Sequence, residues 1–416
     1  MPSLTPPARP ASSPATGPAV PQTPPPAHPR HPPAPPVSRA TPGEALASLT
    51  PASFGIVMAT GIVSLASARL GLTGAGRSLF VLNVGLYLLV WSLVLLRFLR
   101  HRPRLLADLA DHARGPGFFT AVAGTGVLGI QFIELAGRND LGWALWWFAL
   151  ALWLALTYGI FAALTVKADK PPLDRGINGV WLLAVVATQA IAVLGTLLAG
   201  SAPPPWRSAL GFFCLSMWLW GGMLYIWLMS LIFYRCLFLR LAPADLAPPY
   251  WINMGAMAIS TLAGARLVLV AQDMPFLAQL LPFLKGFAVF YWAAGTWWIP
   301  LLLVLGVWRH LLRRFPLRYD PGYWGAVFPL GMYAAATHEL SQALGLAFLD
   351  WVPPLFVAAA LAAWSLALLG LLVTLAKILG PRGSALIASR TRVPCRGGRH
   401  AIDRRGKAAA GCRAGC

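Results

Sequence analysis

Ten long apolar stretches follow one another along the chain, separated by short polar connectors. Each holds about 20 residues or more, the length at which a helix crosses a bilayer core about 30 Å thick with its own backbone hydrogen bonds satisfied. The pattern predicts an all-α integral membrane domain with ten transmembrane helices, at residues 50–70, 78–100, 117–136, 141–166, 177–199, 207–235, 250–272, 283–311, 322–345 and 352–379.

The odd-numbered stretches differ from the even-numbered ones in composition. The seventh contains YWINMGAMAISTLAGARL (250–267), which is rich in Gly, Ala, Ser and Thr, whereas the fourth contains LGWALWWFALALWLALTYGIF (141–161), which is mostly Leu, Trp and Phe. Small residues let helix backbones approach closely, and bulky apolar residues suit lipid. We therefore expect the odd-numbered helices inside the bundle and the even-numbered helices outside.

An internal repeat supports the same division. An aromatic residue near the start of each odd helix provides the alignment: Phe54, Phe119, Trp181, Trp251 and Trp324. Fifteen residues later, about 22 Å along a helix, stand Arg69, Glu134, Thr196, Arg266 and Glu339. Charged residues are costly in a membrane and are usually paired or functional. The pattern predicts five repeated helical hairpins, with these five residues in one belt near the outer surface.

The belt has two interpretations. In the structural one, neighbouring helices are joined by ion pairs, Arg69 with Glu134 and Arg266 with Glu339. In the functional one, the two arginines form an electropositive outer mouth that attracts anions, with a protonated His338 assisting. The sequence leaves both open.

Composition confines function to the membrane domain. The 416 residues are 57% hydrophobic and 11% charged, far from the quarter that is usual in soluble domains. Residues 1–47 are predicted to be a disordered Pro-rich arm and residues 381–416 a disordered basic tail, leaving 48–380 as the transmembrane domain. The formal charge of +20 comes mainly from tails and loops, and no fold that reads nucleic acid is recognisable.

No motif for catalysis, a cofactor or a metal is present. His338 and Glu339 are not followed by the second histidine of a His-Glu-x-x-His motif. Cys412 and Cys416 lack partner histidines, which argues against a zinc site. We expect neither an enzyme nor a bound cofactor.

The distribution of charge among the connectors predicts the orientation. The basic residues that follow the second, fourth, sixth and eighth stretches are Arg97, Arg100, Arg102, Arg104, Arg114, Lys167, Lys170, Arg175, Arg235, Arg240, Arg309, Arg313, Arg314 and Arg318. The opposite connectors carry little beyond Arg77, Arg138 and Arg207. Because Lys and Arg concentrate in cytoplasmic loops, we expect a multi-pass protein of the plasma (inner) membrane with both termini in the cytoplasm.

Four segments resemble the tellurite-resistance/C4-dicarboxylate transporter family. They are PASFGIVMATGIVSLA, YWINMGAMAISTLAGA, TWWIPLLLVLGVWRH and RYDPGYWGAVFPLGMYAAATHEL. That family includes bacterial tellurite-resistance protein A, fungal malate permease, yeast sulfite efflux protein and the plant guard-cell slow anion channel. The resemblance covers about residues 48–380 and does not extend to either tail.

The resemblance implies an all-helical homotrimer in which each protomer has its own pore, with the odd helices around the pore and the even helices outside. In channel members of the family a phenylalanine on the ninth helix occludes the pore, and Phe328 resembles it. Pro329 removes a backbone donor, which predicts a bend that steers the ring toward the axis. Superposing the repeats puts four smaller or flexible residues at the same level: Met58, Ala123, Val185 and Gly255.

We therefore predict the passage of small anions, either a C4-dicarboxylate such as malate or an inorganic anion, through a pore in each protomer that a phenylalanine gate occludes. A proton-coupled C4-dicarboxylate carrier is an alternative, in which His338 and Glu339 carry the proton and Arg266 meets a carboxylate. An efflux protein for sulfite or a tellurite-related species is another. A membrane scaffold that transports nothing is more remote.

Overall fold

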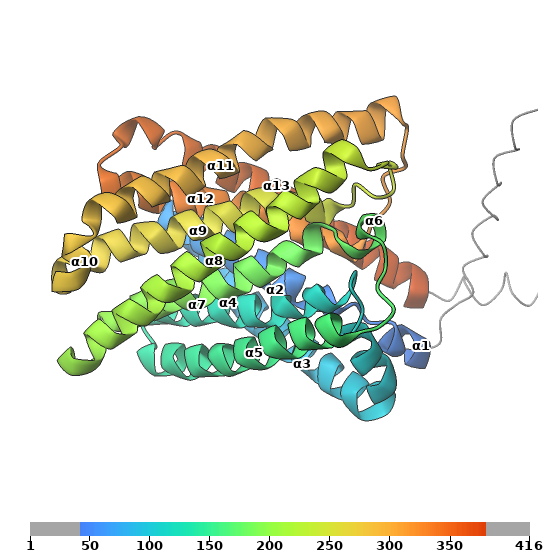
Figure 1. Ribbon diagram of the computed structural model, residues 1–416, viewed down its shortest axis with the longest axis horizontal. Helices are drawn as coiled ribbons and strands as arrows, with labels where there is room; N and C mark the ends of the chain where they lie inside the picture. Colours follow the sequence, from blue (N-terminus) through green and yellow to red (C-terminus); the bar gives the residue numbers. More distant parts are fainter. Residues whose placement is uncertain (1–41, 380–416) are drawn as a thin grey trace, which may run out of the picture. The chain divides into compact units, whose positions relative to one another are not determined.

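The computed structural model describes residues 42–379, and within that part every regular element is a helix (Figure 1). The predicted basic tail and residues 1–41 of the predicted arm lie outside the described residues. Residues 42–47, which the sequence places in the arm, form the short helix α1 (Pro42–Ala47). The buried guanidinium of Arg97 donates a hydrogen bond to the carbonyl of Ala47 at 3.1 Å, and this contact ties the end of α1 to the membrane domain.

Five helices with small side chains form the inside of the bundle. These inner helices are α2 (Gly55–Arg69), α4 (Phe119–Ala136), α7 (Leu183–Ala199), α9 (Ile252–Val270) and α12 (Trp324–Leu344). In the most apolar part of the first four, between 72% and 94% of the residues are buried. In α12, 14 of the 21 residues are buried. The prediction that the odd-numbered helices lie inside is confirmed.

Five longer helices surround them. These outer helices are α3 (Thr73–Leu109), α5 (Asn139–Val166), α8 (Pro204–Phe238), α11 (Leu281–Val307) and α13 (Val352–Leu379). Only 17% to 56% of the residues in their most apolar parts are buried, and many bulky side chains such as Trp147 and Leu366 are exposed. The exposed Leu, Phe and Trp form an apolar surface that suits lipid.

The inner helices form a closed ring. Each packs against two others, in the order α2, α4, α7, α9, α12 and back to α2. Each outer helix packs on the inner helix that precedes it in the chain and also contacts the next inner helix of the ring. In Figure 1 the long helices run side by side, with the short helices α6 (Leu173–Gly176) and α10 (Pro275–Gln279) at opposite ends. The fold is therefore five helical hairpins arranged around one axis, as the repeat predicts.

Tight turns set the start of each inner helix. Each begins with a short 3-10 helix: η1 (Pro51–Phe54), η2 (Gly115–Phe118), η3 (Gly179–Leu182), η4 (Pro248–Trp251) and η7 (Pro321–Tyr323). In three of these the preceding side chain accepts a hydrogen bond from a free backbone N–H: Thr50, Asn178 and Asp320. Consecutive turns in the order η1, η2, η3, η4 and η7 pack against one another, and together they define the N-terminal end of the ring.

Two of the inner helices end at glycines. Gly137 after α4 and Gly345 after α12 have φ values of 65° and 69°, a conformation that side chains with a Cβ rarely adopt. Each glycine therefore ends its inner helix, and the chain turns there toward the next outer helix. These helix ends lie at the end of the ring opposite the 3-10 turns, which we call its C-terminal end.

The helices agree with the predicted stretches except in two respects. The second stretch is longer than predicted, because α3 continues to Leu109 through a distorted turn at His101 and an internal Pro103. Nine helices of the described part are apolar and long enough to cross a membrane. The one of the ten that falls outside this set is α12, which has a sufficient 21 residues but carries polar residues such as His338 and Glu339.

Candidate functional site

A small cavity lies on the axis at the N-terminal end of the ring. All five inner helices or their 3-10 turns contribute to its wall, which consists of Ala52, Gly55, Met58, Thr120, Val180, Leu183, Pro249, Ile252, Pro321, Gly322, Trp324, Gly325 and Phe328. Its volume is about 30 Å³, room for about one or two water molecules. Most of these residues belong to the helix starts, whereas Met58 and Phe328 lie one turn further in. These two side chains therefore form the inner end of the cavity.

Larger hollows lie elsewhere, and two of them are mostly apolar. These two have volumes of about 450 and 530 Å³ and apolar linings that include the exposed side chains of Leu366 and Leu88. Both are on the outside of the helix bundle, among exposed apolar side chains. The axial cavity is smaller, but all five repeats meet there.

The structure brings together only part of the predicted gate level. Phe328 and Met58 are 1% and 2% exposed and both close the cavity. Ala123 and Val185 are fully buried but do not line it. Gly255 does not line the cavity either, and a Cβ added to it would stand 2.9 Å from Cγ of Pro329. Gly255 thus allows a close contact between α9 and α12, and its place on the pore wall at the level of the gate stays a prediction, as do those of Ala123 and Val185.

The register of the repeats explains this incomplete match. Phe54 and Trp251 are the residues just before α2 and α9, Phe119 and Trp324 are the first residues of α4 and α12, and Trp181 lies two residues before α7. The aromatic residues are therefore out of register by up to two positions, about 3 Å along a helix. A shift of one position turns a side chain by about 100° around the helix, so residues that the aromatic alignment matches need not face the same way.

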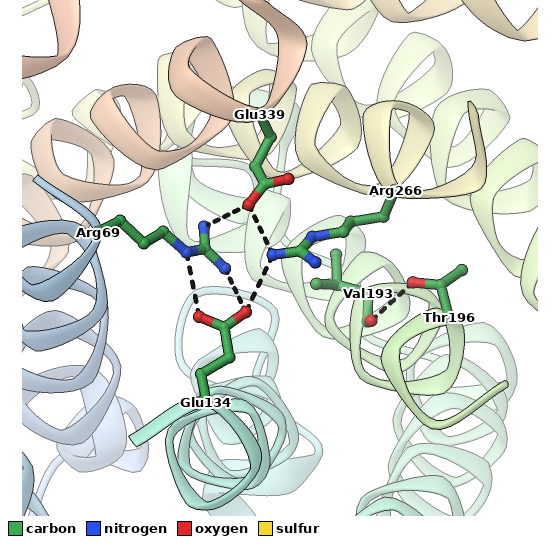
Figure 2. Close-up of polar contacts among 6 residues, drawn as sticks. All are labelled: Arg69, Glu134, Val193, Thr196, Arg266 and Glu339. Carbon is green, nitrogen blue, oxygen red and sulfur yellow. Dashed lines mark hydrogen bonds and ion pairs between the residues drawn. The ribbon is translucent and has the colours of Figure 1, made fainter. Parts of the chain in front are cut away.

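Four of the five belt residues meet at the C-terminal end of the ring (Figure 2). Arg69 donates hydrogen bonds from Nε and Nη2 to the two carboxylate oxygens of Glu134, at 3.1 and 2.7 Å. Arg266 donates from Nη2 to Glu339 at 2.6 Å and to Glu134 at 2.9 Å. A further ion pair joins Nη1 of Arg69 to Glu339 at 3.3 Å. Two arginines and two glutamates thus form one network with no net charge, which we call the ionic network.

The ionic network lies across the axis. Arg69 and Glu134 come from the neighbouring helices α2 and α4, and Arg266 and Glu339 from the neighbours α9 and α12. The bond between Arg266 and Glu134 is different, because α7 separates α9 from α4 on one side of the ring and α12 and α2 separate them on the other. Such a bond spans the centre of the ring. The side chains are 9% to 18% exposed, so the network is also within reach of solvent.

Two predicted members of the site stay outside this network. The hydroxyl of Thr196 donates to the carbonyl of Val193 on its own helix, at 2.7 Å (Figure 2). His338 precedes Glu339 directly, but among residues 42–379 no hydrogen bond or ion pair joins it to the four charged residues. Within the same range no cluster of three or more His, Cys, Asp or Glu residues could hold a metal ion.

Comparison with known proteins shows which protein family the chain belongs to. The family model described as a voltage-dependent anion channel, SLAC1, matches residues 48–372. The chain belongs to the SLAC1 family.

Relatives of this SLAC1-family chain include an uncharacterised membrane protein of Mycobacterium tuberculosis, which is 40% identical over 160 residues, or 38% of this chain and 81% of that protein. A sulfite efflux pump of Trichophyton rubrum is 25% identical over 350 residues, covering 77% of this chain and 89% of the pump. A malic acid transport protein of Schizosaccharomyces pombe is 21% identical over 307 residues, 70% of each chain. The resemblance drawn from the sequence is confirmed at the level of the family, and the chain is a membrane protein of an anion channel and transporter family.

Sequence reasoning missed a second repeated feature of this SLAC1-family chain. A basic side chain in, or just after, each of four outer helices donates to a backbone carbonyl in the segment before the preceding inner helix: Arg97 to Ala47, Lys167 to Ala110, Arg235 to Ile177 and Arg309 to Leu246. The distances are 3.1, 3.0, 3.0 and 2.5 Å. The regular recurrence of a cation after each even stretch was a signal for these contacts. The same recurrence is also expected from the concentration of Lys and Arg in cytoplasmic loops, so by itself it did not reveal the contacts.

Proposed function

We propose that the chain passes small anions along the axis of the inner ring and that Phe328, with Met58, closes the path in this conformation. The observation that carries the proposal is the axial cavity, whose wall comes from all five repeats and whose inner end is these two side chains. A hydrophobic constriction can stop ions by excluding water from a narrow passage. A single phenylalanine ring is enough to do so where the surrounding helices carry small residues.

Pro329 supports the position of the gate. Its ring packs against Gly255, so α9 and α12 approach closely beside Phe328. Pro329 also has no N–H to offer the carbonyl of Gly325 one turn earlier. The segment that carries Phe328 thus has one helical hydrogen bond fewer than an ordinary helix, which lowers the energy needed to move the ring.

We infer small oxyanions as the substrate class. The relatives are named for sulfite and for malic acid, and both are oxyanions at neutral pH. Chloride and other inorganic anions are the competing cargo.

A proton-coupled carrier is the second candidate for the mechanism, because two carboxylates, those of Glu134 and Glu339, lie on the axis and could carry protons. Anion flux that responds to an imposed pH gradient at zero membrane potential would favour the carrier, and flux that follows only the anion gradient and the potential would favour the channel.

We further propose a homotrimer in the plasma membrane, with the N-terminal end of the ring facing the cytoplasm. The support for the orientation is the concentration of Arg and Lys in the connectors at that end. The mass of the detergent-solubilised particle by light scattering tests the trimer. Protease protection in inside-out vesicles tests the orientation.

The gate is tested by flux through liposomes that contain the purified protein. We expect Phe328→Ala to raise the anion flux, because it removes the ring that ends the axial cavity. The matched control is Phe119→Ala: Phe119 is also 1% exposed and also on an inner helix, but its ring contacts Phe161 of α5. Both changes should cost about 3–5 kcal/mol of stability, and the control should not raise the flux. Equal flux from the two variants at equal folded fraction would rule out the gate.

A further inference from the structure

The two arginines of the ionic network are held very differently. Arg69 donates two hydrogen bonds to Glu134, from Nε and Nη2, while its buried Nη1 makes no hydrogen bond and lies 3.3 Å from Glu339 in an ion pair. Arg266 makes both of its carboxylate contacts through Nη2 alone, and its buried Nε has no partner. Arg69 is therefore held on one carboxylate by two donors of its guanidinium, whereas Arg266 is attached to both carboxylates through a single nitrogen and its Nε is unused.

Release of Arg266 would leave neither carboxylate alone. Glu134 would keep both hydrogen bonds from Arg69, and Glu339 would keep its ion pair with Nη1 of Arg69. Breaking a buried ion pair is expensive mainly because it leaves an unpaired charge behind. Here Arg69 leaves neither carboxylate without an ion pair, although Glu339 gives up its hydrogen bond from Arg266. The main cost is therefore finding a new partner for Arg266.

An anion that moves along the axis must pass Arg266. The bond from Arg266 to Glu134 crosses the ring between helices that are not neighbours. An entering anion would be the new partner, since it can accept hydrogen bonds from the free side of the guanidinium. The two glutamates repel the same anion, which keeps its binding weak enough for it to leave, as conduction requires.

We infer that Arg266 is a mobile anion-binding residue that exchanges Glu134 and Glu339 for a passing oxyanion, while Arg69 holds the two glutamates in place. The inference rests on the proposed function and names the residue that selects the substrate. The planar fork of a guanidinium matches two oxygens of one anion, whereas a halide offers a single acceptor point. Arg266 therefore favours carboxylates and sulfite over chloride.

The test uses purified protein in two assays, so that a failure of transport and a failure of this site can be told apart. The first is equilibrium binding of acetate, sulfite and chloride in detergent, and the second is flux of the same anions into liposomes. We expect Arg266→Gln to lower the affinity for acetate and sulfite about tenfold or more, since a hydrogen bond to a charged group is worth about 1.5–3 kcal/mol, and to change chloride less. Arg266→Lys keeps the charge without the fork and should likewise reduce the preference for oxyanions.

The matched control is Arg138→Gln. Arg138 lies at the same end of the ring in an ion pair with Asp140, but both side chains are more than half exposed, so its loss removes a charge without touching the axis. Unfolding measurements on all variants identify any that do not fold, and Arg266→Lys retains the positive charge if Arg266→Gln is too unstable. The inference is overturned if both Arg266 variants keep the oxyanion preference of the unmodified protein, or if Arg138→Gln reduces it equally. Absence of flux from the unmodified protein would instead count against the proposed function.

Discussion

Replacement of Gly255 by alanine tests a close contact between α9 and α12. A Cβ at this position would stand 2.9, 3.2 and 3.3 Å from Cγ, Cβ and Cα of Pro329. Ordinary contacts of this kind are about 3.5–4.0 Å, so a shift of about half an ångström is required. The pyrrolidine ring cannot rotate away, and the third atom belongs to the backbone. The helices themselves must separate.

We expect Gly255→Ala to lower the free energy of unfolding by about 1–3 kcal/mol, the usual cost of overpacking. The control is Gly159→Ala on the outer helix α5, where an added Cβ meets nothing within 4 Å. There alanine should stabilise the helix by up to about 1 kcal/mol. The assay is equilibrium unfolding in detergent, monitored by tryptophan fluorescence. If Gly255→Ala were as stable as Gly159→Ala, the contact with Pro329 would not be a packing constraint and this reasoning would be wrong.

The same change should affect transport. Phe328 precedes Pro329 directly, so separation of α9 and α12 displaces the segment that carries the gate. We expect a higher anion flux from Gly255→Ala than from Gly159→Ala at equal folded fraction in liposomes. An unchanged flux together with the predicted loss of stability would mean that the position of Pro329 does not determine closure.

Three further predictions concern parts of the fold away from the axis. Arg235→Ala should lower the free energy of unfolding by about 2–4 kcal/mol, because this 5% exposed side chain donates hydrogen bonds to a backbone carbonyl and to a buried tyrosine hydroxyl. Its control, Arg138→Ala, removes an exposed ion pair and should cost less than about 1 kcal/mol. Trp153→Phe removes an indole N–H that donates to a buried threonine of α7 at 2.9 Å and should cost about 1 kcal/mol more than Trp147→Phe on the exposed side of the same helix; equal unfolding midpoints would refute this. Burial and a nearby lysine lower the pKa of His112 in the folded protein. The unfolded chain therefore binds the proton more readily, and the free energy of unfolding should fall as the pH drops through about 6.5. His112→Gln should reduce the difference between the unfolding midpoints measured at about pH 7.5 and 5.5.

The sequence alone was sufficient to predict the architecture of the membrane domain. Helix length and the alternation of small-residue and bulky stretches predict ten helices and place the odd-numbered ones inside, and the described part of the chain has that arrangement. The length of a helix and its inner or outer position depend on that helix and its immediate surroundings, so composition and periodicity are enough to predict them. The fifteen-residue spacing from aromatic to charge also brought Arg69, Glu134, Arg266 and Glu339 to one level, because the rise per residue of a helix is fixed.

The contacts between helices were decided by tertiary structure. The bond across the ring from Arg266 to Glu134, the contact of Gly255 with Pro329 and the buried cation of Arg235 depend on how far each helix is rotated about its own axis and on which helices face each other. A displacement of one residue along the chain turns a side chain by about 100°, so an alignment uncertain by two positions could not say whether Val185 or Gly255 faces the centre. Spacing along a helix is local and can be read from the chain, whereas rotation is set by the packing of all ten helices together.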